Sequence, residues 1–357
     1  MGKASTKLLV ANRGEIACRV LRAARSLGLS TVAVYSEADA ELPHVELADE
    51  AYDIGPARAA ESYLRGDRLL EVAQKSGARL LHPGYGFLSE NAAFAADCAR
   101  AGLVFVGPAP ATTAAMGDKE QARRTAAEAG VPVLPGSSKL PEDDVEIARI
   151  AQDVGFPLLV KACAGGGGIG MRQVDTPEAL AVSVQTTRSM AQKAFGDGAV
   201  YLERLVRCAR HVEVQVFGFG DGDAVHLFER DCSLQRRHQK VIEEARAPAL
   251  HEGVAERMAR AAVRLCQLSR YSGAGTVEFL LDADTQEFYF LEMNTRIQVE
   301  HPVTEMITGL DLVEAQIRWA LGDATLRRDL AQSVIKAQGH AIEARVYAEN
   351  PAKSFMP

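Results

Sequence analysis

Two glutamates and an asparagine in the second half of the chain could hold a metal ion. The segment GAGTVEFLLDADTQEFYFLEMNTR predicts a β-hairpin with strands at residues 276–281 and 288–293. In such a hairpin Glu278 and Glu292 lie opposite or nearly opposite each other on one face. Asn294 follows two residues after Glu292 and therefore points the same way.

Facing carboxylates repel each other, and a hard cation between them would remove the conflict. A set of oxygen ligands without histidine or cysteine suits Mg²⁺ or Mn²⁺ bound together with nucleotide phosphates. The alternative is a solvent-facing edge on which water screens both charges. Apolar residues on both faces of FYFLEM favour the metal site, because buried carboxylates are normally paired.

A run of four glycines at residues 165–168 lies between two strand-like segments, the first of which ends near Lys161. Glycine loses much conformational freedom on folding, so glycines in an ordered hairpin indicate that the backbone approaches something closely. Bare N–H groups around an anion, with the Lys161 ammonium nearby, would form a lid over phosphates. A flexible linker is the alternative. The stretch matches neither the P-loop nor a GxGxxG turn that opens a helix.

Two further polar clusters flank the hairpin that carries Glu278 and Glu292. For the basic residues of ERDCSLQRRHQKVIEEA a solvated face is the default explanation; these residues are Arg230, Arg236, Arg237, His238 and Lys240. After the hairpin, Arg296, Gln298 and Glu300 recur with a period of two, which would aim them into one cleft. An arginine for an anion beside a glutamate that can take a proton is a general-base arrangement, and a structural ion pair is the alternative.

The first third of the chain must position part of this chemistry, and it alternates strands with helices. Strand-and-turn segments cover residues 7–14, 30–36, 78–86 and 103–107, and helical segments lie between them. This alternation predicts a doubly wound parallel sheet, whose ligands gather beyond the carboxyl ends of the strands. The motifs ANRG and HPGYGFLSEN fall at two such ends, although the second would also suit a plain Pro-Gly turn.

A proline-rich connection then ends the alternation and marks a domain boundary. A helix at residues 119–129 and a second proline-rich loop follow. A helix at 141–155, the glycine hairpin, a helix at 177–196 and a strand at 199–206 form a compact α+β lobe. This lobe, residues 132–206, is small enough to act as a mobile lid.

Composition limits the class of protein. A chain of 357 residues with 47% apolar content can bury two or three cores, and a net charge of -7 argues against nucleic acid as the main partner. No apolar run approaches the ~20 residues that span a membrane, and the first residues lack a signal-peptide pattern, so we expect a cytoplasmic protein. Six cysteines without a CxxC pair indicate reduced, mostly buried thiols.

These residues resemble the biotin carboxylase component of biotin-dependent carboxylases, of the acyl-CoA, pyruvate or urea carboxylase type, which has an ATP-grasp fold. The matching motifs occur in the family's order and cover essentially the whole chain: ANRGEIACRV, HPGYGFLSEN, MGDK, AGGGGIGM, RHVEVQVF, ERDCSLQRRHQKVIEEA, EMNTRIQVEHPVTEMITG and HAIEARVYAEN. The resemblance implies a Rossmann-like N-terminal domain at 1–117, an ATP-grasp domain at 118–330 and, at 331–357, the beginning of an incomplete C-terminal domain.

The resemblance also implies the site residues. ATP would contact Lys119, Lys161, Gly167, Gly168, Glu203, Arg204, Leu205, Val206, His211, Gln235 and His238. Two Mg²⁺ or Mn²⁺ ions would bind Glu278, Glu292 and Asn294. Bicarbonate would contact Lys240, Arg296, Gln298 and Val299, with Lys240, Arg296 and Glu300 as the catalytic residues. Arg345 would contact biotin.

The implied activity is that of a ligase in which Glu300 deprotonates bicarbonate for attack on ATP, and the resulting carboxyphosphate supplies CO₂ to biotin. The implied partners are a biotin carboxyl carrier domain, a carboxyltransferase component and, in a full-length form, a second copy of the chain. Another ATP-grasp ligase or a truncated ATP-binding fragment without turnover are the alternatives. Ile169, where many relatives carry a basic residue, and Asn350, where aspartate is usual, depart from the family's pattern.

Overall fold

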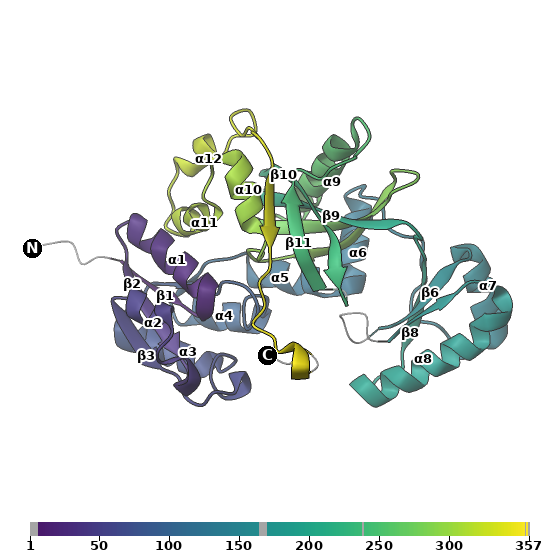
Figure 1. Cartoon of the computed structure of the whole chain (residues 1–357), viewed down its shortest axis with the longest axis horizontal. Coiled ribbons are helices and arrows are strands. Elements are labelled where there is room, and N and C mark those ends of the chain that lie inside the picture. Colours follow the sequence, from purple (N-terminus) through teal and green to yellow (C-terminus); the bar gives the residue numbers. More distant parts are fainter. Residues whose placement is uncertain (1–5, 164–169, 238, 354, 356–357) are drawn as a thin grey trace, which may run out of the picture.

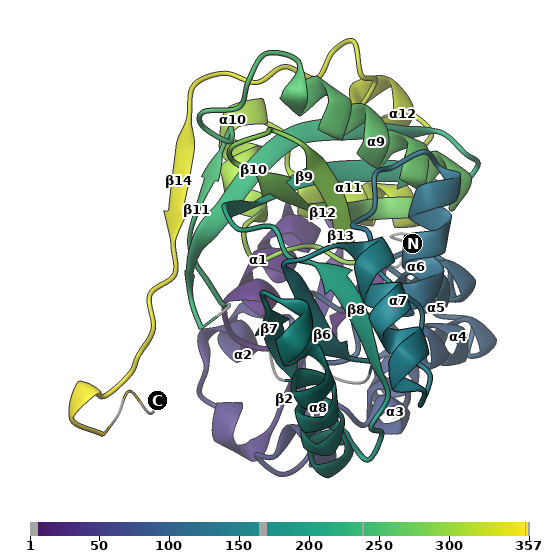
Figure 2. The same ribbon diagram turned by 90° about the vertical axis from the view of Figure 1, so that its right-hand side faces the viewer.

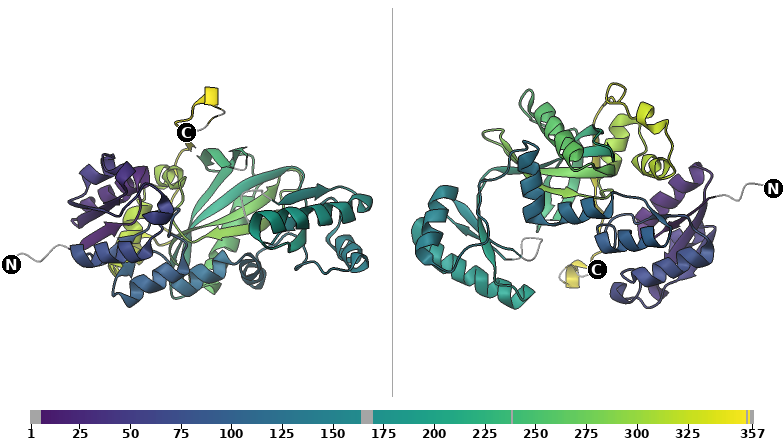
Figure 3. Two further views of the ribbon diagram at one scale, coloured as in Figure 1. Left: turned by 90° about the horizontal axis from the view of Figure 1, so that it is seen from below. Right: turned by 180° about the vertical axis from the view of Figure 1, so that it is seen from behind.

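The structure is a computed structural model that describes residues 6–163, 170–237, 239–353 and 355. It contains three β-sheets, which lie in a row (Figure 1). The N-terminal domain and the lid lie at opposite ends, and the largest sheet lies between them, as the views from below and behind also show (Figure 3). The predicted combination of an α/β domain with an α+β region is confirmed.

The N-terminal domain is built on a five-stranded parallel sheet in the order β3-β2-β1-β4-β5, as the alternation predicts. Its strands are β1 (Lys7–Val10), β2 (Ser30–Tyr35), β3 (Glu50–Asp53), β4 (Leu80–His82) and β5 (Val104–Phe105). Its helices are α1 (Gly14–Ser26), α2 (Pro43–Leu47), α3 (Gly66–Ser76) and α4 (Ala92–Arg100), with the 3₁₀ turns η1 (Glu37–Asp39) and η2 (Ala59–Glu61). Strand β3 is not among the strands predicted from the sequence. No residue of the edge strand β3 is fully buried, so it carries no apolar alternation.

The two motifs at the strand ends of this sheet meet, as predicted. The side chain of Asn12, after β1, donates hydrogen bonds of 2.7 Å to the backbone carbonyls of Pro83 and Tyr85, after the neighbouring strand β4. Gly84 has a left-handed φ of 62°, and a Cβ there would lie 2.9 Å from the Asn12 amide. The glycine of HPGYG therefore allows the close approach of the two turns.

The central domain is a six-stranded antiparallel sheet in the order β13-β12-β9-β10-β11-β14. Its strands are β9 (Ala209–Phe219), β10 (Ala224–Arg236), β11 (Gln239–Ala245), β12 (Ser272–Asp282), β13 (Phe288–Asn294) and β14 (Ala341–Ala344). Its helices are α5 (Pro110–Gly117), α6 (Lys119–Glu128), α9 (Val254–Leu268), α10 (His301–Thr308), α11 (Leu312–Ala320) and α12 (Leu326–Asp329), and η4 (Pro351–Lys353) follows β14.

Strand β9 shows why this sheet has two different faces. Val212, Val214 and Val216 alternate along it and pack in one apolar cluster with α6 and α9. Glu213 and Gln215, between them, point to the opposite face and are also completely buried. Further along the sheet, α1 of the N-terminal domain shares an apolar cluster with α11 and with β9 and β10, which joins the two domains.

The β-hairpin predicted at residues 276–293 is confirmed as β12 and β13. The two strands pair antiparallel, and Glu278 lies directly opposite Glu292, with an irregularity in the register after Glu278. Asn294 lies on β13, as Glu292 does, and pairs with Thr276 on β12. Strand β13 is an edge of the sheet.

The lid has a three-stranded sheet in the order β7-β6-β8 and its own apolar cluster. It consists of α7 (Asp144–Val154), β6 (Leu158–Ala162), β7 (Met171–Val174), η3 (Pro177–Ala179), α8 (Leu180–Phe195) and β8 (Val200–Arg204). Strands β6 and β7 form the predicted hairpin. The glycine run, with Gly167, Gly168 and the departure at Ile169, lies outside the described residues, as does His238.

Residues after α12 return to the central domain. Strand β14 pairs antiparallel with β11 and becomes the sixth strand of its sheet, and residues 346–353 extend away from it (Figure 2). Within the described ranges, no helix is long and apolar enough to cross a membrane. All six cysteines are free, and four of them are buried, which agrees with the predicted reduced thiols.

Candidate active site

A cavity of about 900 Å³ lies where the three sheets approach one another. Tyr85 and Gly86 line it from the N-terminal domain, whereas the other lining residues come from the lid and the central sheet. Thirteen of the residues predicted from the resemblance line it: Lys119, Lys161, Glu203, His211, Gln235, Lys240, Glu278, Glu292, Asn294, Arg296, Gln298, Val299 and Arg345. The fold therefore gathers residues that are more than 200 positions apart in the sequence.

Four predicted residues lie elsewhere. Arg204 is exposed, and its side chain donates a 3.0 Å hydrogen bond to the Val154 carbonyl, on the α7 side of the lid. Leu205 and Val206 continue the chain from β8 and do not line the cavity. Glu300 is completely buried behind the cavity wall.

The two facing carboxylates differ in environment. Glu278 is buried and accepts hydrogen bonds from Lys240, Asn294 and, at 3.1 Å, Gln298. Burial alone would raise its pKa, but the Lys240 ammonium and a 2.8 Å ion pair with His211 lower it. Glu292 is open to the cavity, and its pKa is raised by partial desolvation and by the charge of Glu278.

The chemistry of this donor set fits a hard divalent cation. Glu278 and Glu292 offer carboxylate oxygens from neighbouring strands, and Asn294 adds an amide oxygen. A solvent-facing edge, the alternative interpretation, does not describe Glu278, which is only 4% exposed. Mg²⁺ or Mn²⁺ bound here would supply charge neutralisation for phosphate oxygens.

Lys240 is the centre of a buried cluster of charges. Its Nζ lies 2.7 Å from Glu213, 2.9 Å from Glu278 and 2.5 Å from Glu300. Burial disfavours the ammonium, but the three carboxylates outweigh burial and raise the pKa of Lys240 strongly. The Lys240 and Arg230 charges conversely hold the pKa of Glu213 far below its usual range although it is buried. Lys240 is therefore a fixed positive charge beside Glu278.

Arg230 contributes a second buried cation to this cluster. It is completely buried, and its guanidinium donates to Glu213 at 2.6 Å and to Gln215 at 2.7 Å. The default explanation of a solvated basic face is therefore wrong for Arg230 and for Lys240, but it describes the exposed Arg236. Sequence reasoning missed Glu213. The segment VEVQV could have indicated it, because Glu213 and Gln215 there alternate with valines, as polar residues on one face of a strand do.

Glu300 bridges two cations. Its Oε1 accepts from Lys240, and its Oε2 lies 3.1 Å from an Arg345 nitrogen. Arg345 also donates a 2.6 Å hydrogen bond to Glu243. The segment before Glu300 is a turn and not an extended strand, so the predicted period of two does not aim this side chain into the cavity.

Arg296 and Gln298 do converge on the cavity. Arg296 donates to the Gln298 side chain at 2.8 Å and to the Asn294 side chain at 2.9 Å. Its ion-pair partner is Glu90 of HPGYGFLSEN, at 2.8 Å, and not Glu300. Sequence reasoning missed Glu90, because nothing local indicates that the two motifs meet.

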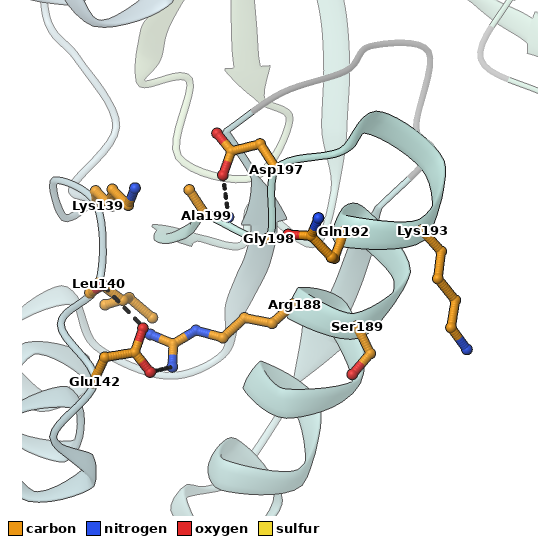
Figure 4. Close-up of a pocket in the computed structure, with 10 residues that line it drawn as sticks. All are labelled: Lys139, Leu140, Glu142, Arg188, Ser189, Gln192, Lys193, Asp197, Gly198 and Ala199. Carbon is orange, nitrogen blue, oxygen red and sulfur yellow. Dashed lines mark hydrogen bonds and ion pairs between the residues drawn. The ribbon is translucent and has the colours of Figure 1, made fainter.

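A second cavity, of about 540 Å³, lies within the lid and away from this site (Figure 4). Arg188 from α8 extends into it toward Glu142. Its guanidinium also donates to the backbone carbonyls of Leu140 and Pro141. The Arg188 guanidinium in this cavity is thus already hydrogen-bonded to residues of the lid itself.

Comparisons with known proteins identify the family of this chain. The family model for the N-terminal domain of biotin carboxylase matches residues 4–113, and the model described as carbamoyl-phosphate synthase L chain, ATP binding domain, matches residues 118–328. Biotin carboxylase 2 of Bacillus subtilis is 51% identical over 99% of this chain and 78% of its own length. The biotin carboxylase domain dimer of Hydrogenobacter thermophilus 2-oxoglutarate carboxylase, solved with MgADP, ADP and bicarbonate, superposes with a TM-score of 0.89 at 45% identity, covering 99% of this chain and 77% of that one.

The parallel N-terminal domain, the antiparallel central sheet and the lid define an ATP-grasp protein, and the chain belongs to the biotin carboxylase family. The alpha subunit of rat mitochondrial methylcrotonoyl-CoA carboxylase is 51% identical over the whole of this chain. The chain spans about half the length of that subunit, 49%.

Proposed function

We propose that this chain catalyses the ATP-dependent carboxylation of biotin on a carrier protein, with bicarbonate as the carbon source and carboxyphosphate as the intermediate. The observation that carries the proposal is the arrangement around Lys240. One ammonium contacts a carboxylate of the metal pair, Glu278, and also the buried Glu300. A site for nucleotide phosphates and a candidate base, which is buried directly behind the cavity wall, therefore share one cation.

Bicarbonate binds, in this proposal, between Lys240 and the Arg296 guanidinium, with Gln298 and Val299 beside it. Glu300 receives the bicarbonate proton, and its Lys240 and Arg345 contacts compensate the charge of this buried carboxylate before the transfer. The bicarbonate oxygen then attacks the γ-phosphorus of ATP, and ADP leaves. Carboxyphosphate breaks down to CO₂ and phosphate, the phosphate takes the ureido proton of biotin, and CO₂ joins the biotin nitrogen.

The remaining residues have supporting roles. Lys119, on α6, and Lys161, on the lid strand β6, line the cavity and would neutralise phosphate oxygens, with the backbone of Gly167 and Gly168. Glu203 to Val206 would hold the adenine, and His211, Gln235 and His238 would lie along the nucleotide. A Mg²⁺ or Mn²⁺ ion on Glu278, Glu292 and Asn294 would supply further positive charge. Arg296 and Arg345 would stabilise the biotin enolate.

The proposal includes the domain division 1–117, 118–330 and 331–357. The two family matches, at 4–113 and 118–328, support the first two segments. Strand β14 of the third segment pairs with the central sheet. The proposal also includes a carrier domain, a carboxyltransferase component and a second copy of the chain as partners, and action in the cytoplasm. The solved relative described as a biotin carboxylase domain dimer supports the second copy.

The test is release of ADP from Mg-ATP and bicarbonate, measured with and without free biotin. We expect biotin to stimulate turnover, and we expect Arg296→Ala and Glu300→Ala to abolish it. Arg124→Ala is the matched control, because Arg124 is exposed on α6 and should be dispensable. Turnover that ignores biotin would indicate another ATP-grasp ligase. Tight ATP binding without turnover would mean that these residues do not form a complete catalytic unit.

A further inference from the structure

The lid is joined to the central domain by two connecting segments that are hydrogen-bonded to each other. The backbone N–H of Ser137 donates to Leu202 at 2.8 Å, and that of Arg204 donates to Pro135 at 2.9 Å. Gly136 forms a bridge with Glu203, and a Cβ on Gly136 would lie 2.8 Å from the Leu202 carbonyl. The glycine thus permits a tight pairing of the two segments.

One side chain from the central domain holds both segments. Arg123 lies on α6, whose buried alanines pack into the apolar cluster of the central sheet and α9. Its guanidinium donates a 2.8 Å hydrogen bond to the Leu134 carbonyl on the outgoing segment. The same group lies 3.2 Å from Oε2 of Glu203 on the returning segment.

Glu203 lies between two cations. Its Oε1 is 2.7 Å from Nζ of Lys161, and its Oε2 faces Arg123. The residue is only 7% exposed, so both oxygens of this buried carboxylate need partners. Burial disfavours the Lys161 ammonium, but Glu203 outweighs this effect and raises the pKa of Lys161. A firmly charged lysine is therefore held by a carboxylate in the nucleotide cavity.

A nucleotide phosphate can attract Lys161 only in competition with Glu203. When Lys161 turns to a phosphate, Glu203 loses one of its two cations and remains buried. Arg123 is the cation that stays, because its second hydrogen bond fixes it to Leu134. Without Arg123 the carboxylate would hold Lys161 more strongly, and the two connecting segments would lose their common contact.

We propose that Arg123 is a positioning residue of the nucleotide site, which compensates Glu203 and holds the lid connection while Lys161 transfers from Glu203 to the nucleotide phosphates. This inference rests on the proposed use of ATP. It assigns a role to a side chain that does not line the cavity and that neither the motifs nor the resemblance indicates.

The first experiment compares Arg123→Gln, Arg123→Lys and the matched control Arg124→Gln, one residue further along α6. The dissociation constant for Mg-ADP is measured by calorimetry, and kcat for ADP formation is measured at saturating ATP. We expect Arg123→Gln to weaken Mg-ADP binding roughly tenfold or more, with a much smaller change in kcat, because one partner of a buried charge is removed. Arg123→Lys should recover part of the affinity, and Arg124→Gln should bind as the unchanged chain does.

A double-mutant cycle separates this role from a general loss of structure. In a Glu203→Gln background the carboxylate charge is absent, so Arg123→Gln should weaken binding less than it does alone. Equal effects in both backgrounds, or unchanged binding by Arg123→Gln, would overturn the inference while leaving the proposed function intact. Failure of the unchanged chain to bind Mg-ADP would overturn both.

Discussion

Glu243 on β11 lies directly opposite Glu343 on β14, and each carboxylate keeps one buried oxygen that has no hydrogen-bond partner among the described residues. Arg345 contacts Glu243 and connects this pair to Glu300. Like charges opposite each other destabilise a sheet, and one arginine serves two of the three carboxylates. The pair is therefore expected to hold a proton near neutral pH.

This arrangement predicts that stability falls as the pH rises. Burial and the charges of Glu243 and Glu300 raise the pKa of Glu343 to about 7, and Arg345 and Arg230 lower it less. A carboxyl whose folded pKa is raised stabilises the fold fully below its unfolded pKa, and this contribution disappears as the pH passes from about 4.5 to about 7. Urea unfolding at pH 5 and pH 8 should show a loss of roughly 1–3 kcal/mol from this group, discounted for partial exposure.

Glu343→Gln should remove that part of the pH dependence, because glutamine imitates the protonated carboxyl. Glu252→Gln on the exposed surface is the control and should leave the dependence unchanged. An identical difference between pH 5 and pH 8 in the unchanged chain and in Glu343→Gln would contradict the prediction.

Lys240 should be essential for stability as well as for chemistry. Lys240→Met leaves the buried carboxylates Glu213, Glu278 and Glu300 without their common cation. We expect a loss of ~3–5 kcal/mol in the free energy of unfolding at pH 7. Urea denaturation followed by circular dichroism measures it, with the exposed Lys336→Met as control. A loss below about 1 kcal/mol would show that the cluster does not depend on this ammonium.

Removal of one facing carboxylate should change metal affinity and metal-free stability in opposite directions. Glu292→Gln removes a metal ligand, so the Mg²⁺ concentration for half-maximal ADP formation should rise at least about tenfold. The same change relieves the repulsion with Glu278, so metal-free stability should rise by ~0.2–1 kcal/mol. Glu287→Gln, before the start of β13, is the control. Lower stability together with unchanged Mg²⁺ dependence would exclude this pair as a metal site.

The lid should unfold without the rest of the molecule. Ile147 is buried in the lid cluster, which is formed by α7, α8 and the three lid strands. Ile147→Ala should cost ~2–5 kcal/mol, and amide hydrogen exchange should accelerate in β6 and β8 and not in β9. Ile317→Ala, in the cluster shared by α1 and α11, should instead accelerate exchange in β1 and β9. Equal acceleration of the lid and the central sheet by Ile147→Ala would show that the two unfold as one unit.

Elements with a local pattern could be predicted from the sequence. The alternation of strands and helices predicted the parallel sheet, and the period of two in the metal hairpin predicted that Glu278 faces Glu292. The family motifs predicted most of the residues that line the cavity. Strand β3 was not predicted, because an exposed edge strand needs no alternation of apolar and polar residues.

Only the tertiary structure decided which charges are partners. Glu213, Arg230 and Lys240 are ordinary charged residues in the sequence, and burial makes them a cluster. Arg296 pairs with Glu90, which is 206 positions away, and Arg123 reaches Glu203 across the lid connection. The physical reason is that electrostatic partnership depends on distance and desolvation, and both are set by how the three sheets pack and not by any spacing along the chain.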